Sequence, residues 1–244
     1  MKSFAIRLKS TILASAFALS SGMAFAQTLY SDGHADFGVV FEDSSWIIHY
    51  HFDSGAVLDG ATITEDLEFE PGEVIVLLGD SAKVSLPVPV AFLGANTGDD
   101  IWLIPQIQMQ GVPWLGFNTE ELDNTWGPIK FALSSFSGPG NFALWSTGSF
   151  GEPTIKMQTN DGVDPDVDFE TIGITHAHYN WGFTELGTYE LGITISALNQ
   201  DPSIGFQTGT ATIIVQVVPE PTSVLLILTA GAVLGFARRR RSDR

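Results

Sequence analysis

The chain has 244 residues and no cysteine, and its 28 acidic side chains outnumber 11 basic ones, giving a formal net charge of −17. Disulfides and thiolate-bound metal centres are therefore excluded, and so acidic a surface repels nucleic acid. Eight basic residues lie in the two terminal segments, so residues 27–218 hold three lysines against 26 acidic residues, a charge near −23. Such a surface raises the local concentration of divalent cations.

Residues 1–26 have the three parts of a secretory signal. Three basic residues precede an apolar run from Ile12 to Leu19, and small residues end at Ala26. This order is typical of a leader that is removed on export. We therefore predict a signal peptide over residues 1–26 and a secreted mature chain.

Short apolar runs separated by Gly, Pro, Asn and Asp recur over residues 27–217, without a sustained 3.6-residue apolar period. About 190 residues suffice for one domain with a full hydrophobic core. The pattern predicts a single all-β domain, a β-sandwich of the immunoglobulin-like or jelly-roll-like kind with Greek-key connections. Strands are expected at residues 35–41, 45–52, 73–78, 101–104, 130–133, 142–146, 188–197 and 209–217.

The five histidines are confined to three short segments, and two of these segments are His-x-His pairs. Alternate side chains of a strand leave the same face, so His49 projects with His51, and His176 projects with His178 if their segment is extended. The large apolar residues of 46–52 alternate with His49 and His51 and project from the opposite face of the strand. This alternation turns the two histidines away from the core. Greek-key connections often bring the first and penultimate regions of a sandwich into one sheet, so the pairs can converge.

This distribution favours a metal site. A single His-x-His pair is more typical of a solvated strand face, but two pairs and one further histidine together favour ligation. Imidazole suits zinc and copper, and carboxylates are the other donors that this chain offers. We predict a zinc site, with copper or calcium as alternatives, whose ligands come from His34, Asp36, His49, His51, His176 and His178.

Three loops carry further candidates. Residues 160–168 alternate carboxylates that could bind calcium, but they lack the spacing and distal glutamate of an EF-hand, which favours a solvated turn. The loop over 111–128 carries Trp114, Phe117 and Trp126, which could stack on a sugar or plug the end of the sandwich. Residues 87–100 are expected to form the third loop.

Residues 218–244 form a second terminal signal. Its parts are Pro219, Glu220 and Pro221, an apolar stretch over 224–237, and the cluster Arg238, Arg239, Arg240 and Arg241. About fourteen apolar residues are few for a transmembrane helix across a ~30 Å hydrocarbon core, and the arginines would hold its end on the cytoplasmic side. The segment resembles the PEP-CTERM sorting signal of Gram-negative bacteria. That resemblance implies an exosortase-type enzyme as partner and delivery to the cell surface or extracellular matrix after a transient stay in the inner membrane; an ordinary membrane anchor is the alternative.

Five stretches of the mature chain, taken in order, resemble the surface-anchored domain called choice-of-anchor M. They are residues 31–38, 101–106, 114–119, 138–145 and 176–184. The resemblance implies a secreted or surface β-domain that is often associated with metal-ion transport systems, and it implies no established enzymatic activity.

The sequence thus predicts a surface-anchored, non-enzymatic metal-binding protein that serves metal acquisition or storage. A structural or adhesive matrix protein, braced by a metal and in contact with polysaccharide, is the alternative. A metalloenzyme is a third, less favoured one, because the chain has neither a His-Glu-x-x-His helix nor a Gly-x-Ser-x-Gly elbow.

Overall fold

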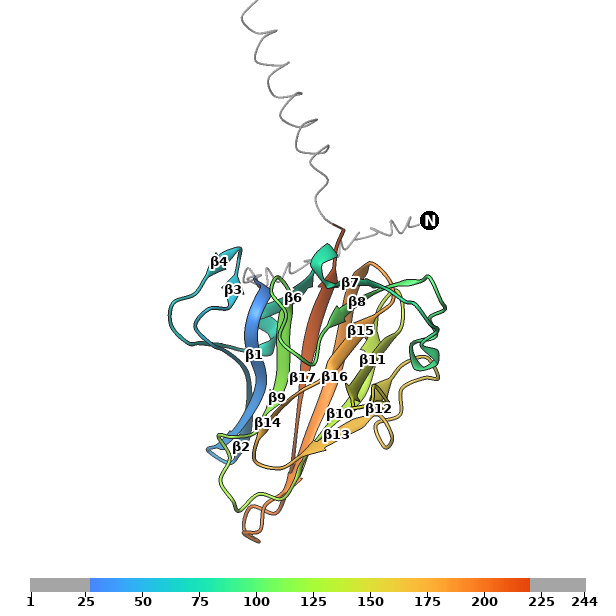
Figure 1. The fold of residues 1–244 in the computed structure, drawn as a ribbon. Coiled ribbons are helices and arrows are strands. Elements are labelled where there is room, and N and C mark those ends of the chain that lie inside the picture. The colour runs from blue at the N-terminus through green and yellow to red at the C-terminus, as the bar shows by residue number, and fades with distance from the viewer. Residues whose placement is uncertain (1–26, 220–244) are drawn as a thin grey trace, which may run out of the picture.

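The computed structural model describes residues 27–219, which form two β-sheets joined by loops and three short 3₁₀ turns (Figure 1). The predicted signal peptide and all but the first two residues of the predicted sorting segment, its apolar stretch included, lie outside these residues. Between residues 27 and 219 no helix has the length and apolar character needed to span a membrane. The all-β prediction is confirmed.

The larger sheet has the strand order β13-β10-β16-β17-β6-β1-β2-β5, with β9 and β3 also paired to β1, β14 to β9, and β4 to β3. Its strands are β1 (Thr28–Glu42), β2 (Ser45–Phe52), β3 (Val57–Leu58), β4 (Ala61–Thr62), β5 (Leu67–Phe69), β6 (Val74–Leu78), β9 (Pro113–Asn118), β10 (Ile129–Ser137), β13 (Phe169–Ile172), β14 (His176–His178), β16 (Gly187–Leu198) and β17 (Phe206–Val217).

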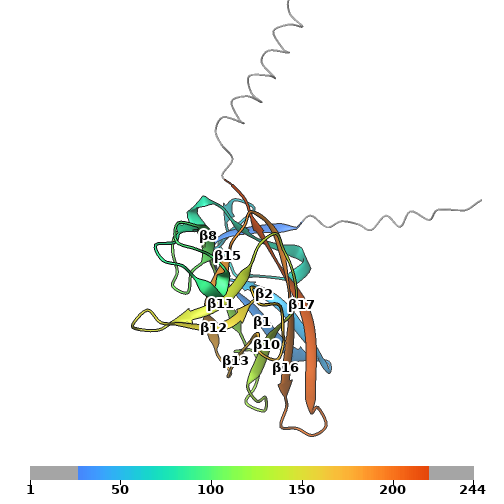
Figure 2. The same cartoon turned by 90° about the vertical axis from the view of Figure 1, so that its right-hand side faces the viewer.

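The smaller sheet has the order β12-β11-β15-β8-β7. Its strands are β7 (Lys83–Ser85), β8 (Asp100–Ile104), β11 (Phe142–Thr147), β12 (Pro153–Gln158) and β15 (Asn180–Phe183), and the 3₁₀ turns are η1 (Pro71–Glu73), η2 (Asp80–Ala82) and η3 (Ala91–Leu93). Figure 2 shows β11 and β12 on one side of the molecule and the long strand β17 on the other.

All eight predicted strands are present, and β2 has the predicted bounds. The prediction that residues 111–128 form a loop is wrong over β9, because this strand pairs with β1 on one side and β14 on the other. Gly116 and the flanking proline and asparagine obscure its strand character in the sequence, since glycine and proline usually mark turns. The burial of β9 on the core overrides that local preference.

The core between the sheets is built largely from aromatic rings. Phe117 of β9 stacks on Phe131 of β10 with 4.4 Å between ring centroids, and it meets Trp181 of β15 edge-on at 5.3 Å. The indole N–H of Trp181 donates to the Leu115 carbonyl at 3.2 Å, which ties the smaller sheet to β9. The core thereby fixes β9, and with it the strand's opposite face.

The predicted sugar-stacking aromatics of this region take other roles. Phe117 and Trp126 are buried, and Trp126 packs on Phe41 and Trp46 with centroid separations of 4.9 and 4.7 Å. Trp114 is half-buried and stacks on a histidine. The alternative reading, a hydrophobic plug at the end of the sheet, describes the position of Trp126.

Replacing Phe117 by alanine is expected to lower the free energy of unfolding by about 3–5 kcal/mol, because the ring is fully buried and its loss leaves a cavity between the sheets. Phe150, which is 97% exposed, is the matched control, and its replacement should change stability by no more than about 0.5 kcal/mol. Guanidinium unfolding followed by tryptophan fluorescence measures both. Equal effects of the two substitutions would contradict this description of the core.

Candidate metal centre

All five histidines lie on the face of β2, β1, β9 and β14 that points away from the core between the sheets. One row across this face contains His51, Asp36, Gly116 and His178, which are successive partners in the strand register. His34 precedes Asp36 by two residues on β1 and shares its face. The predicted projection of both His-x-His pairs from strands is therefore confirmed.

The next row contains His49, Gly38, Asn118 and His176. Its two histidines stand at opposite ends of the row, on β2 and β14. His49 therefore lies next to His51 on β2, and His176 lies next to His178 on β14. Two strands, β1 and β9, separate His49 from His176.

Three side chains of this face meet at distances that suit a metal ion. His34 Nε2 lies 3.1 Å from His178 Nε2 and 3.6 Å from Asp36 Oδ2, and Asp36 Oδ1 lies 3.7 Å from His178 Nε2. Ligand atoms bonded at ~2.0–2.1 Å around a tetrahedral zinc ion lie ~3.3–3.4 Å apart. Within residues 27–219 these three form the one group of three or more His or carboxylate side chains close enough to share an ion.

A glycine makes this meeting possible. Gly116 lies between Asp36 and His178 in the row, and a Cβ atom there would stand 2.5 Å from Asp36 Oδ1 and 2.9 Å from His178 Cε1. Any other residue at this position would push the two side chains apart. A glycine inside a strand often marks such a close approach, and this is the signal by which the sequence could have identified Gly116.

Asp53, which is not among the predicted ligands, holds His34 in place. Its Oδ2 lies 2.7 Å from His34 Nδ1, the distance of a charge-assisted hydrogen bond. With Nδ1 engaged by this carboxylate, Nε2 is the His34 nitrogen that faces His178. Metal-bound histidines are commonly oriented by a carboxylate in this way. Asp53 follows His51 by two residues, in the phase of the histidine pair, which is the signal that was available.

Burial shifts the pKa values of two members of the cluster. The pKa of Asp36 is raised, chiefly by burial, although His34 and His176 oppose the rise. The pKa of His178 is lowered to about 4, chiefly by burial and then by the neighbouring His34 and His176. Burial thus disfavours charge on either group alone, and Asp36 Oδ1 has no hydrogen-bond partner. A cation between them would supply the missing partner.

The other three predicted ligands stand outside this cluster. The buried His49 places Nε2 2.9 Å from Glu121 Oε1. His176, whose side chain is 45% exposed, places Nδ1 3.1 Å from Glu120 Oε2, and its ring centroid is 6.3 Å from that of His34.

His51 lies between two carboxylates, with Nε2 3.6 Å from Asp53 Oδ1 and Nδ1 3.5 Å from Glu68 Oε1. The geometry thus brings His34, Asp36 and His178 together and pairs the remaining histidines with carboxylates.

The acidic loop over 160–168 uses its carboxylates internally. Asp168 accepts hydrogen bonds from the backbone N–H groups of Gln158 and Asp164, at 2.9 and 2.8 Å, and Asp164 accepts from the N–H of Asp166 at 3.0 Å. These bonds describe a turn stabilised by its own side chains. Asp168 is buried in it, whereas the solvated turn that the sequence favoured over calcium describes the exposed Asp161, Asp164 and Asp166.

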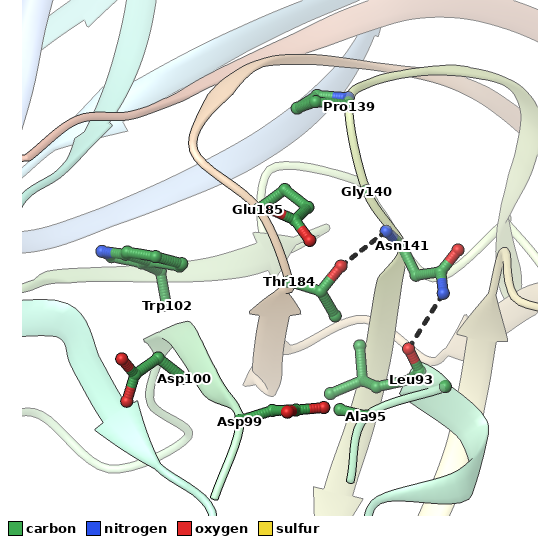
Figure 3. A pocket seen from close by; sticks show the side chains of 11 residues that line it. Leu93, Ala95, Asp99, Asp100, Trp102, Pro139, Gly140, Asn141, Thr184 and Glu185 are labelled. Carbon is green, nitrogen blue, oxygen red and sulfur yellow. Dashed lines mark hydrogen bonds between the residues drawn. The ribbon is translucent and has the colours of Figure 1, made fainter.

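Two cavities bear on possible ligands. One, of about 420 Å³, opens beside the cluster and is lined by His34, Asp53, Trp114, His176, Ser54, Gln108 and two glycines. The other, of about 580 Å³, lies between loops at the smaller sheet (Figure 3). In its wall the Asn141 N–H donates to Thr184 Oγ1 and the Asn141 side-chain amide donates to the Leu93 carbonyl, at 2.8 and 3.0 Å.

Comparison with known proteins identifies the C-terminal segment. Residues 217–241 match the PEP-CTERM protein-sorting motif. No curated protein and no solved structure matches the chain. The motif indicates an extracellular, surface-exported protein with a transient membrane anchor, processed by an exosortase-type sorting enzyme.

In the metal-free protein, the melting temperature is expected to fall as the pH is lowered from about 6.5 to about 4. The pKa of His178 is about 4 in the fold and ~6.5 in an unfolded chain, so within this window the unfolded state binds the additional proton and unfolding is favoured. The raised pKa of Asp36 acts in the opposite direction. Calorimetry of wild type and His178→Gln across this range tests the assignment: the variant should lose less stability, and parallel curves would contradict it.

Proposed function

We propose that this is a surface-displayed metal-binding protein without catalytic activity, and that it holds zinc through His34, Asp36 and His178. The observation that carries the proposal is the approach of the two Nε2 atoms to 3.1 Å beside the buried carboxylate. Two imidazoles and one carboxylate are a donor set that zinc accepts readily, while copper remains the competing ion on affinity grounds. Calcium would require more oxygen donors than this cluster offers.

Export supports a role in capturing or storing metal at the cell surface. The sorting motif directs the chain out of the cell, and the net charge near −23 over residues 27–218 concentrates cations around it. We extend the proposal to the mature domain as a whole: a single β-sandwich of the choice-of-anchor M kind, released from its signal peptide and from a short transmembrane helix, and working with a metal-transport system.

One observation favours a second candidate, a structural or adhesive matrix protein braced by its metal. His34 and His178 are 144 residues apart in sequence and stand on different strands, so a shared ion would link β1 to β14. Contact with extracellular polysaccharide would belong to this role.

Zinc binding tests the proposal directly. The full chain, purified in mild detergent without a polyhistidine tag and dialysed against zinc, is expected to hold about one zinc per chain by elemental analysis. His34→Ala, Asp36→Ala and His178→Ala should each remove it, because each substitution deletes a ligand. His49→Ala and His51→Ala are matched controls on the same sheet face and should retain it. Zinc retained by the first three variants, or lost from the controls, would overturn the assignment.

Asp53→Asn is expected to weaken zinc binding by about 10–100-fold while leaving one zinc per chain at saturation, because Asp53 orients His34 without contacting the ion. A competition titration with a chromogenic chelator measures the change. Asp66→Asn, which alters a neighbouring acidic residue that accepts from the Ser54 N–H, is the control for lost negative charge. Equal weakening in both variants would assign the effect to charge alone.

A further inference from the structure

The chain supplies fewer ligands to the cluster than a closed zinc shell requires. His34, Asp36 and His178 provide three, whereas structural zinc sites are almost always four-coordinate. Asp53 contacts the opposite nitrogen of the His34 ring and therefore belongs to the outer shell. Three protein ligands and one position for an external donor is the arrangement of open zinc sites.

The polar groups nearest the cluster are engaged elsewhere. His176 pairs with Glu120 at 3.1 Å, and its ring centroid lies 5.8 Å from that of His178. The side-chain oxygen of Asn118 accepts the Glu120 N–H at 2.7 Å, and its amide nitrogen faces Asp36. Neither group completes the shell as the side chains stand.

The cavity of about 420 Å³ borders the cluster at His34. Its lining includes His34 and His176 but neither Asp36 nor His178. His34 is also the most exposed of the three side chains, at 17%, against 7% for His178 and 4% for Asp36. A cavity of this size accommodates a small molecule, and the neutral groups that it offers are the side chains of Ser54, Gln108 and Trp114.

Charge selects the class of molecule that fits. A divalent ion held by Asp36 beside the Asp53 carboxylate leaves a local charge near zero, and the surrounding domain is strongly acidic. A multiply charged anion would therefore be repelled, whereas a neutral or monoanionic donor would not. We propose that the bound ion keeps one coordination position open to this cavity, an inference that rests on the proposed function. A small neutral or monoanionic nitrogen or oxygen donor binds at that position.

Cobalt(II) in place of zinc reports on this position, because its visible absorption changes when a ligand enters the shell. The full chain in detergent is loaded with cobalt and titrated with imidazole as the neutral donor and azide as the monoanion. We expect a saturable spectral change with each probe. An unchanged spectrum would overturn the inference while leaving the metal site intact, whereas failure to bind cobalt or zinc would remove the proposed function itself.

Two variants separate the cavity from alternative explanations. Gln108→Trp should fill the cavity and weaken imidazole binding by about tenfold without changing cobalt affinity. Gln200→Trp, at an exposed glutamine of the turn between β16 and β17, is the matched control and should leave it unchanged. A response to imidazole in His176→Ala but not in wild type would show that His176 closes the shell, and would overturn the inference.

Discussion

The parallel pairing of β1 with β9 is the constraint on which the candidate metal centre depends. Asp36 and His178 stand on strands separated by β9, and neighbouring strands lie ~4.8 Å apart, so their backbones are ~9.6 Å from each other. The two side chains meet only because the register puts Gly116 between them. A shift of one residue would place Leu115 or Phe117 there and turn the glycine toward the core. Packing of Phe117 against Phe131 of the larger sheet and Trp181 of the smaller sheet prevents that shift.

The cluster is largely withdrawn from solvent although it lies outside the core between the sheets: Asp36 is buried, and His34 and His178 are half-buried. Trp114 covers His178, with ring centroids 3.9 Å apart and planes inclined by 14°. Cover of this kind excludes water and lowers the local dielectric, which is why the pKa of His178 falls and that of Asp36 rises. Leaving Asp36 Oδ1 without a partner costs ~1–3 kcal/mol of stability. A fold that retains such a group gains most from a ligand that satisfies it.

The sequence predicted eight of the seventeen strands and the phase of the histidines, because alternation along a strand is a local property. The strands that it missed are six residues long or shorter, so they carry little alternation. It could not predict which histidines meet, because that depends on neighbouring strands: β14 reaches β1 only through β9, a strand that its glycine and proline concealed. Asp36 was selected beside the histidines. Asp53 was not predicted, because it acts on the site through the His34 ring. Gly116 was not predicted, because its contribution is the absence of a side chain.

Metal binding would raise the free energy of unfolding in the same way whether the protein captures the metal or is braced by it. Measurements of stability alone therefore do not distinguish the two roles. Any ligand that binds only the folded state stabilises it by RT ln(1 + [L]/Kd), whatever its biological purpose. An ion joining His34 to His178 across 144 residues would therefore brace the sheet even if its role were transport. The distinction lies in exchange: a shell closed by four protein ligands releases its ion slowly, whereas a position open to solvent lets an incoming donor start the transfer. The open position proposed at the cavity beside His34 would therefore favour capture over bracing.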